Sequence, residues 1–334
     1  MVDYYLGVDG GNSKTHVLVI TCQGRPVGFG ASGGSDFQEV GIEAAQREWQ
    51  TAIDQALSCA NLERQQIKLA CFCLAGADLP EDYVLLQEAV SKMASPMPIV
   101  VKNDTIAALR AGLHNLPFGV TVVVGVGFNA AGRGKDGHEI ILPGLGYISG
   151  DYGGGRWLGR QIIRAVIRAW DGRGPATCLS QLVLDAMGVS NEMELIQRLR
   201  YENQAREDVI DLVPILFDVA YDGDEVAQGL LIRLGTEVGI TANTLIKKLG
   251  LQCEEVPVVL STGVFRGKGP LLIDVVTTVV HRVAPRAKVV VPDFLPVVGA
   301  ALEALDEGGV HTSSELVDNL REGLASEYSD LLSD

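Results

Sequence analysis

C-x-x-C cysteine pairs, blocks of basic residues and long apolar runs are all missing from this chain of 334 residues. The six cysteines form no C-x-x-C pair, so we expect free, reduced thiols, as in a cytoplasmic protein. The net charge is −15 and Lys and Arg form no block, which argues against nucleic acid or an anionic membrane as the main partner. No apolar run could span a bilayer, and no basic stretch precedes an apolar core at the N-terminus, so we expect neither a membrane segment nor a signal peptide.

What is present indicates a well-folded α/β protein of two domains. Hydrophobic residues make up 47% of the chain, glycine occurs 39 times, and the length is sufficient for two domains. Strand-like runs alternate with segments of helical periodicity. We expect a three-strand meander at the N-terminus, further strands at 67–74, 99–101, 120–124, 130–133, 138–142, 256–260 and 288–291, and helices near 40–60, 81–93, 106–113, 157–170 and 295–305.

The most informative stretch is residues 6–20, which reads as strand, polar turn, strand. Its turn contains two glycines and a row of small polar residues, and successive turn amides can form an anion-binding concavity. Asp9, at the end of the first strand, is placed to hold Mg²⁺, which prefers one or two carboxylates plus phosphate oxygens. A plain Gly/Asn-rich hairpin explains this stretch equally well. It is not a Walker loop, because the residues after Lys14 alternate like a strand.

A second acid stands between a strand and a helix. Asp104 follows the strand at 99–101 and precedes the helix at 106–113. Ligands gather at the carboxyl edge of open α/β sheets, so Asp104 is a candidate catalytic residue. A simple helix cap is an equally good interpretation, because Asp caps helices well.

The opening pattern repeats from residue 120 onward. A strand leads into the turn at 125–129, and two more strands follow with a hairpin turn at 134–137. Two Gly-rich hairpins are a more specific signal than one, and together they could grip a polyphosphate across a cleft between domains. The loop at 142–159 is rich in glycine, residues 176–250 read as a helical insert, and the turn at 261–265 is a third backbone concavity or a plain β-to-α turn.

Taken together, these motifs resemble those of a known superfamily. The chain resembles the sugar kinase/Hsp70/actin ATPase superfamily and, within it, the N-acetylglucosamine kinase group, also named for the BadF/BadG/BcrA/BcrD ATPases. The motifs that match are Asp9-Gly10-Gly11-Asn12-Ser13-Lys14-Thr15, Asn103-Asp104, Gly125-Val126-Gly127-Phe128-Asn129, Gly144-Leu145-Gly146 with Gly150-Asp151, and Ser261-Thr262-Gly263-Val264-Phe265.

The resemblance implies two ribonuclease H-like (actin-like ATPase) domains around a central cleft. We expect the first domain at 1–115, with the C-terminal segment at 295–334 packed back on it. We expect the second at 116–294, with the helical insert at about 176–250.

The resemblance also implies a role for each motif. Asp104 would be the catalytic base and Asp9 the magnesium anchor. The residues expected to bind ATP are Gly10, Gly11, Asn12, Ser13, Lys14, Thr15, Gly125, Gly127, Asn129, Thr262, Gly263 and Phe265. The residues expected to bind the sugar are Asp36, Gly76, Asp78, Asn103, Gly144, Gly146 and Asp151.

Several positions depart from the pattern of the group. Val126 and Phe128 replace hydroxyl residues in the second turn, and Tyr152 replaces an acid after the sugar loop. Asp36 stands where the group has a sugar-contacting Asn, and the third turn begins Ser261-Thr262 instead of Gly-Gly. Because backbone amides bind the phosphates, ATP binding stays plausible, whereas the identity of the substrate is put in doubt.

We therefore expect an ATP- and Mg²⁺-dependent kinase that phosphorylates a hydroxyl of an amino sugar, N-acetylglucosamine or glucosamine, and that forms a homodimer. One alternative is an ATPase that activates a dehydratase or reductase through an iron–sulfur cluster; the scattered cysteines speak against it. The other is a non-catalytic regulator that binds ATP or a sugar; no basic patch or pair of DNA-binding helices supports it.

Overall fold

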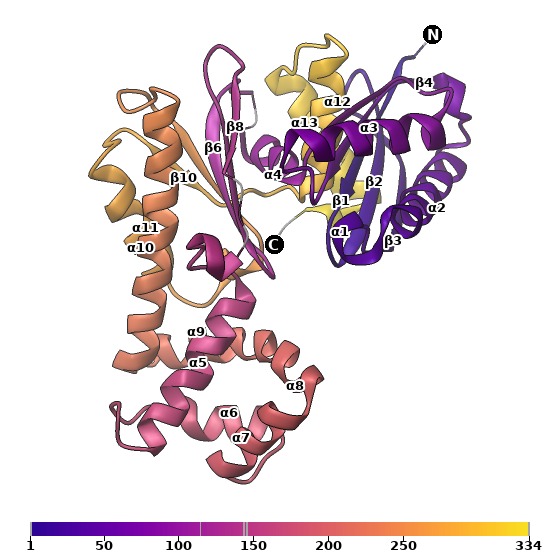
Figure 1. The fold of residues 1–334 in the computed structure, drawn as a ribbon. Coiled ribbons are helices and arrows are strands. Elements are labelled where there is room, and N and C mark those ends of the chain that lie inside the picture. Colours follow the sequence, from indigo (N-terminus) through magenta and orange to yellow (C-terminus); the bar gives the residue numbers. More distant parts are fainter. Residues whose placement is uncertain (1, 114, 143, 145, 333–334) are drawn as a thin grey trace. The chain divides into compact units, whose positions relative to one another are not determined.

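Figure 1 shows the computed structural model of the chain, which describes residues 2–113, 115–142, 144 and 146–332. Within these described residues, ten strands form two five-stranded sheets with helices around them, so the predicted α/β class is confirmed. The first sheet contains β1 (Tyr4–Gly10), β2 (Lys14–Thr21), β3 (Pro26–Gly33), β4 (Ile67–Leu74) and β5 (Ile99–Asn103). The second contains β6 (Gly119–Val124), β7 (Phe128–Arg133), β8 (Glu139–Leu142), β9 (Pro257–Ser261) and β10 (Lys288–Val290).

The helices fall close to the expected segments, with some additions. The α-helices are α1 (Phe37–Val40), α2 (Ile42–Ala60), α3 (Pro80–Ala94), α4 (Asp104–Leu113), α5 (Gly155–Trp170), α6 (Leu179–Ala186), α7 (Glu192–Tyr201), α8 (Asn203–Glu207), α9 (Val213–Tyr221), α10 (Glu225–Lys248), α11 (Leu271–His281), α12 (Pro296–Glu307) and α13 (Ser314–Glu327). Short 3₁₀ helices are η1 (Arg64–Gln66), η2 (Gly146–Ser149), η3 (Asp208–Leu212), η4 (Gly263–Arg266) and η5 (Ser329–Leu331). The short helix α1 lies just before the helix that we expected near 40–60 and was not itself predicted.

The chain divides into two compact units. Unit 1 comprises residues 1–121, 131–143 and 290–334, and unit 2 comprises residues 122–130 and 144–289. This division differs from the expected boundary after residue 115, because residues 131–143 pack with unit 1. Arg133 and Glu139 of that segment form ion pairs with Glu303 and Lys102.

In unit 1 the sheet has the strand order β3-β2-β1-β4-β5 and is covered on both faces. The side chains of α2 and α3 fill one face, and those of α12, α4 and α13 fill the other. Helix α12 lies close to the sheet and to α4. A Cβ atom on Gly7 would lie 2.1 Å from the backbone nitrogen of Ala301, and one on Gly299 would lie 1.9 Å from the carbonyl oxygen of Ala107. Glycine is therefore required at both contacts.

Three strands of unit 1 end at the same edge of the sheet. Strands β1 and β4 are parallel, as are β4 and β5, whereas β2 runs antiparallel to β1. Their carboxyl ends carry the turn at 11–13, the loop at 75–79 and the start of α4. This edge therefore gathers segments that are far apart in the sequence.

Unit 2 is mostly helical. Helices α6 to α10 follow one another between residues 179 and 248, the segment expected to be a helical insert. Helix α10 packs closely on α11, and a Cβ atom on Gly239 would lie 2.6 Å from the Val279 side chain. The second sheet has the order β10-β9-β6-β7-β8.

All six cysteines are free thiols, and Cys71 and Cys73 are buried in β4 as expected from their alternation. Among the described helices, none combines the length and the apolar character needed to cross a bilayer.

Candidate active site

Backbone hydrogen bonds stabilise the turn between β1 and β2. The amide of Gly11 donates to the carbonyl of Lys14 at 3.0 Å, and the carbonyl of Gly11 accepts from the amide of Ser35 at 2.9 Å. Within the described residues, the backbone amides of Asn12 and Ser13 donate to no protein acceptor, and both residues are exposed. An exposed turn with free amides can bind a phosphate group.

The hydroxyl of Thr15 has a different environment from the rest of this turn. Thr15 is wholly buried. Its hydroxyl lies 2.8 Å from the carbonyl oxygen of Gly33 and 2.8 Å from the Ser35 hydroxyl. The side chain of Thr15 thus ties β2 to the loop after β3, and its contact with a ligand would have to come from its backbone.

Asp9 lies one residue before the end of β1. It pairs with His16 of β2 on one side and with Cys73 of β4 on the other. Burial raises the pKa of Asp9 to about 7, against an opposing effect of the positive charge on Lys14. Removing a carboxylate from water at this edge is costly unless a cation compensates it.

Asn103 and Asp104 form the junction between β5 and α4. The buried Asn103 side chain donates to the Ala77 carbonyl at 3.1 Å and to Asp78 Oδ1 at 2.9 Å, and its oxygen accepts from the Thr105 amide at 2.9 Å. Asn103 therefore fixes the loop after β4 against the start of α4.

Asp104 is the first residue of α4, and its atom Oδ1 is buried without a hydrogen-bond partner in the described part of the chain. Burial, followed by the negative charges of Asp9 and Asp78, raises the pKa of Asp104 to about 7. An unpaired carboxyl oxygen with this pKa is suited to accept a proton near neutral pH.

Asp36 and Asp78 complete a cluster of acids around this edge. Asp36 caps α1, accepting from the Gln38 amide at 3.0 Å, and Gly76 adopts φ +79° beside it. A Cβ atom on Gly76 would lie 3.0 Å from Asp36 Oδ1. Burial raises the pKa of Asp36 and of Asp78. We call Asp9, Asp36, Asp78 and Asp104 the acidic cluster.

Unit 2 brings together the other predicted motifs. The Thr262 hydroxyl donates to the Val124 carbonyl, and a Cβ atom on Gly125 would lie 3.9 Å from the Thr262 methyl group. The second Gly-rich turn and the turn after β9 are thus neighbours. Thr262 has φ +100°, Gly263 is exposed and Phe265 is buried.

The predicted sugar loop also lies against the second turn. Asp151 accepts from the Ser149 hydroxyl at 2.7 Å, and its amide donates to the Gly146 carbonyl at 3.2 Å. A Cβ atom on Gly144 would lie 2.8 Å from Asp151 Oδ2 and 3.3 Å from the carbonyl of Phe128. Leu145 of this motif lies outside the described residues. Asn129 uses its side-chain oxygen to accept from the Ala130 amide at 2.9 Å.

The ring of Phe128 explains one departure from the sequence pattern. A Cβ atom on Gly153 would lie only 1.9 Å from this ring, so the ring occupies the space above the glycine-rich segment that leads into α5. The same segment is joined to the second turn by the Gly155 amide, which donates to the Gly125 carbonyl at 2.7 Å. Phe128 therefore packs against the loop at 153–155.

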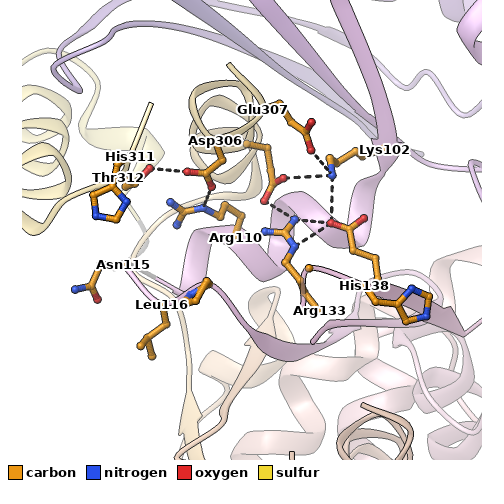
Figure 2. A pocket seen from close by; sticks show the side chains of 14 residues that line it. Lys102, Arg110, Asn115, Leu116, Arg133, His138, Asp306, Glu307, His311 and Thr312 are labelled. Carbon is orange, nitrogen blue, oxygen red and sulfur yellow. Dashed lines mark hydrogen bonds and ion pairs between the residues drawn. The ribbon is translucent and has the colours of Figure 1, made fainter. Parts of the chain in front are cut away.

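Sequence reasoning missed a second cluster of charges. Figure 2 shows it in a cavity of 610 Å³ in unit 1. Its members, which we call the ion-pair cluster, are Lys102, Arg133, Glu139, Glu303 and Glu307. Opposite charges raise the pKa of Lys102 and of Arg133. A single acid in the otherwise apolar helix at 295–305 was a signal that could have revealed Glu303.

Tyr83 was missed as well. Burial and the nearby charges of Glu139 and Asp78 raise the pKa of Tyr83 to about 12, against opposing effects of the Asn103 backbone and the Lys102 charge. The helical spacing of Tyr83 in α3 does not predict that its side chain lies near these charges.

Known proteins resemble this chain over most of its length. The model of the BadF/BadG/BcrA/BcrD ATPase family matches residues 6–304. An N-acetyl-D-glucosamine kinase of Dictyostelium discoideum is 28% identical over 314 residues, covering 91% of this chain and 98% of that protein. A glucosamine kinase of Vibrio cholerae is 27% identical over 242 residues, covering 71% and 78%.

A solved structure shows the same fold. A ROK family glucokinase from Streptomyces griseus, in complex with glucose and AMPPNP, superposes with a TM-score of 0.59 at 16% identity. The superposition covers 92% of this chain and 100% of that one.

Proposed function

The chain belongs to the BadF/BadG/BcrA/BcrD ATPase family, and on that premise we propose that it is a sugar kinase. It transfers the γ-phosphoryl group of ATP to a hydroxyl of an amino sugar, N-acetylglucosamine or glucosamine. The observation that carries the proposal is the unpaired carboxyl oxygen of Asp104 at the carboxyl edge of the sheet. The names of the relatives, an N-acetylglucosamine kinase and a glucosamine kinase, support the choice of substrate.

Asp104 is the general base in this proposal. Its carboxylate accepts the proton of the sugar hydroxyl as that oxygen bonds to the γ-phosphorus and the bond to the β-phosphate oxygen breaks. The pKa of about 7 places Asp104 near the value at which such a base is most effective. Asn103 holds Asp104 in place through its bonds to Asp78 and Thr105.

Backbone amides bind the phosphates of ATP. In unit 1 the unpaired amides of Asn12 and Ser13 bind phosphate, Gly10, Gly11 and Thr15 form the turn around them, and Lys14 adds a positive charge. In unit 2 the turn with Gly125, Gly127 and Asn129 binds phosphate, and the adjacent Thr262, Gly263 and Phe265 bind the adenosine. The proximity of these two turns in unit 2 supports their assignment to one nucleotide.

The sugar is bound by polar groups near Asp104 and by the glycine-rich loop. In unit 1 these are Asp36, Gly76, Asp78 and Asn103, which lie together around the end of β4. In unit 2 they are Gly144, Gly146 and Asp151. Carboxylate and amide groups are suited to hydrogen-bond the hydroxyls of a sugar, and they hold the attacking oxygen in line.

Asp9 would hold Mg²⁺. The fit follows from the chemistry of the site, because the negative charges of Asp9 and Asp104 repel each other without a cation paired to either in the described residues. In the described part of the chain no three metal-binding side chains converge, which suits an ion that keeps waters and phosphate oxygens as ligands. When bound, Mg²⁺ neutralises charge on the β- and γ-phosphates. The expected homodimer and cytoplasmic location stay predictions.

The test is an assay of the full chain with ATP and Mg²⁺ against glucosamine, N-acetylglucosamine, N-acetylmuramic acid and glucose. ADP release is measured by a coupled assay and the phosphosugar by mass spectrometry. We expect an amino sugar to stimulate ADP release and to yield one phosphosugar per ADP. Equal ADP release with and without every sugar would contradict the proposal.

A further inference from the structure

The acidic cluster contains more negative charge than a kinase needs for its base and its metal. Asp104 serves as the base and Asp9 as the metal ligand in the proposed function. Asp36 and Asp78 remain: Asp36 is buried, with 7% of its surface exposed, and Asp78 is partly buried. Two desolvated carboxylates in one site are costly unless a positive charge compensates them.

Asp36 and Asp78 lie close enough to interact. The charge of Asp36 raises the pKa of Asp78, and both charges raise the pKa of Asp104. A Cβ atom on Gly76, two residues before Asp78, would lie 3.0 Å from Asp36 Oδ1, and the Gly76 carbonyl lies 3.5 Å from the Gln38 side chain. The two acids therefore flank one short segment next to Asn103.

Each of these two acids has one oxygen occupied and one free. Asp36 Oδ1 accepts from the Gln38 amide, and Asp78 Oδ1 accepts from the Asn103 side chain. For the second oxygen of each, the described residues provide no hydrogen-bond donor. No Lys, Arg or His forms an ion pair with either acid anywhere in residues 2–113, 115–142, 144 and 146–332.

We infer that Asp36 and Asp78 bind the ammonium group of the substrate, so that the enzyme prefers glucosamine to its N-acetylated form. This inference rests on the proposed function and narrows its substrate class. An ammonium group brings three donors and a positive charge to two carboxylates. An acetamide is neutral and offers one donor, so it leaves both negative charges uncompensated.

The test compares glucosamine, N-acetylglucosamine and glucose by kcat/KM at saturating ATP. In the wild-type protein we expect glucosamine to exceed each neutral sugar at least tenfold. Asp36→Asn and Asp78→Asn should each lower the glucosamine-to-glucose ratio at least tenfold, chiefly through the KM of glucosamine. Asparagine keeps the cap of α1 and the bond to Asn103, so both variants are expected to fold.

Glu39→Gln is the matched control, because Glu39 is an exposed acid on α1 whose charge also reaches Asp36. Glu39→Gln should change the glucosamine-to-glucose ratio of kcat/KM less than twofold. A wild-type preference for N-acetylglucosamine or glucose, or an unchanged ratio in both Asp variants, would overturn the inference while leaving the kinase proposal intact.

Sugar binding measured by calorimetry without nucleotide distinguishes the inferred ammonium site from the kinase proposal. If no sugar is phosphorylated, the kinase proposal fails, but tighter binding of glucosamine than of the neutral sugars still supports the ammonium site. Equal binding of all three sugars would overturn it.

Discussion

The acidic cluster and the ion-pair cluster lie in the same unit and come within two residues of each other along the chain, at Asp104 and Lys102. In the ion-pair cluster every charge has a partner: Lys102 lies 2.8 Å from Glu307 and 3.2 Å from Glu139, and Arg133 lies 2.7 Å from Glu303. In the acidic cluster the described residues supply no paired cation. The ion-pair cluster is neutralised by the protein alone, whereas the acidic cluster is the one that we propose binds Mg²⁺ and the sugar.

The two clusters therefore differ in the role of their buried charges. Glu303 is almost wholly buried, and its burial is tolerated because two cations lie beside it. Through Lys102 the ion-pair cluster holds the end of β5, the strand that presents Asn103 and Asp104. The paired charges thus support the strand that positions the unpaired ones.

Asp104→Asn should have the largest effect on activity. Removing the base is expected to lower kcat about 10²–10⁴-fold while ATP still binds. Steady-state kinetics and nucleotide titration measure the two effects. Asp54→Asn, at an exposed residue paired with Arg64, is the control and should keep the wild-type rate. Turnover of Asp104→Asn at the parent rate would show that Asp104 is not the base.

Glu303→Ala should have the largest effect on stability. It leaves Lys102 and Arg133 without one of their buried partners, so we expect the free energy of unfolding to fall by about 3–5 kcal/mol. Urea denaturation should show a lower midpoint at an unchanged m-value. Glu303→Gln keeps the side-chain shape and should cost less. A loss of less than about 1 kcal/mol would mean that the ion-pair cluster is not a source of stability.

The two clusters should respond to pH in opposite directions in the Mg²⁺- and nucleotide-free protein. The folded pKa of Asp104 is about 7, above its unfolded value of about 3.9. Its contribution to stability is therefore complete below about pH 4 and is lost as the pH rises through about 7. The pKa of Glu139 is lowered by Arg133 and Lys102, so its contribution is present at neutral pH and is lost as the pH falls below its usual value.

Melting temperatures between about pH 3 and 8 check this contrast. Asp104→Asn should flatten the decline toward high pH, and Glu139→Gln should reduce the loss toward low pH. Identical profiles for the wild type and Asp104→Asn would show that Asp104 titrates at its ordinary value.

Glu88→Ala should have the smallest effect. Glu88 pairs with Lys92 at 2.6 Å, but both side chains are largely exposed to solvent. Water and salt screen such pairs, so we expect no measurable change in the urea midpoint. A loss as large as that of Glu303→Ala would mean that pairing alone, without burial, stabilises this protein.

Much of the fold followed from local patterns in the sequence. Alternation and apolar runs located β4 and the hairpin of β1 and β2, and helical periodicity located α2 and α12. The short helix α1 escaped prediction because its four residues are too few to show a period. The observed division into units also escaped it, because residues 131–143 pack with unit 1 through Arg133 and Glu139, contacts that no local pattern encodes.

For the site, the sequence by itself determined which residues are candidates for the chemistry: the glycine-rich turns, Asp9 and the Asn103–Asp104 pair stand out by residue type and order. Only the tertiary structure decided which of them are neighbours and which charges stay unpaired. The register of three parallel strands places Asp9, Asp78 and Asp104 at one edge, and the close packing of α12 brings Glu303 to Lys102. Electrostatic energy depends on distance and burial, which arise from contacts between residues far apart in the sequence.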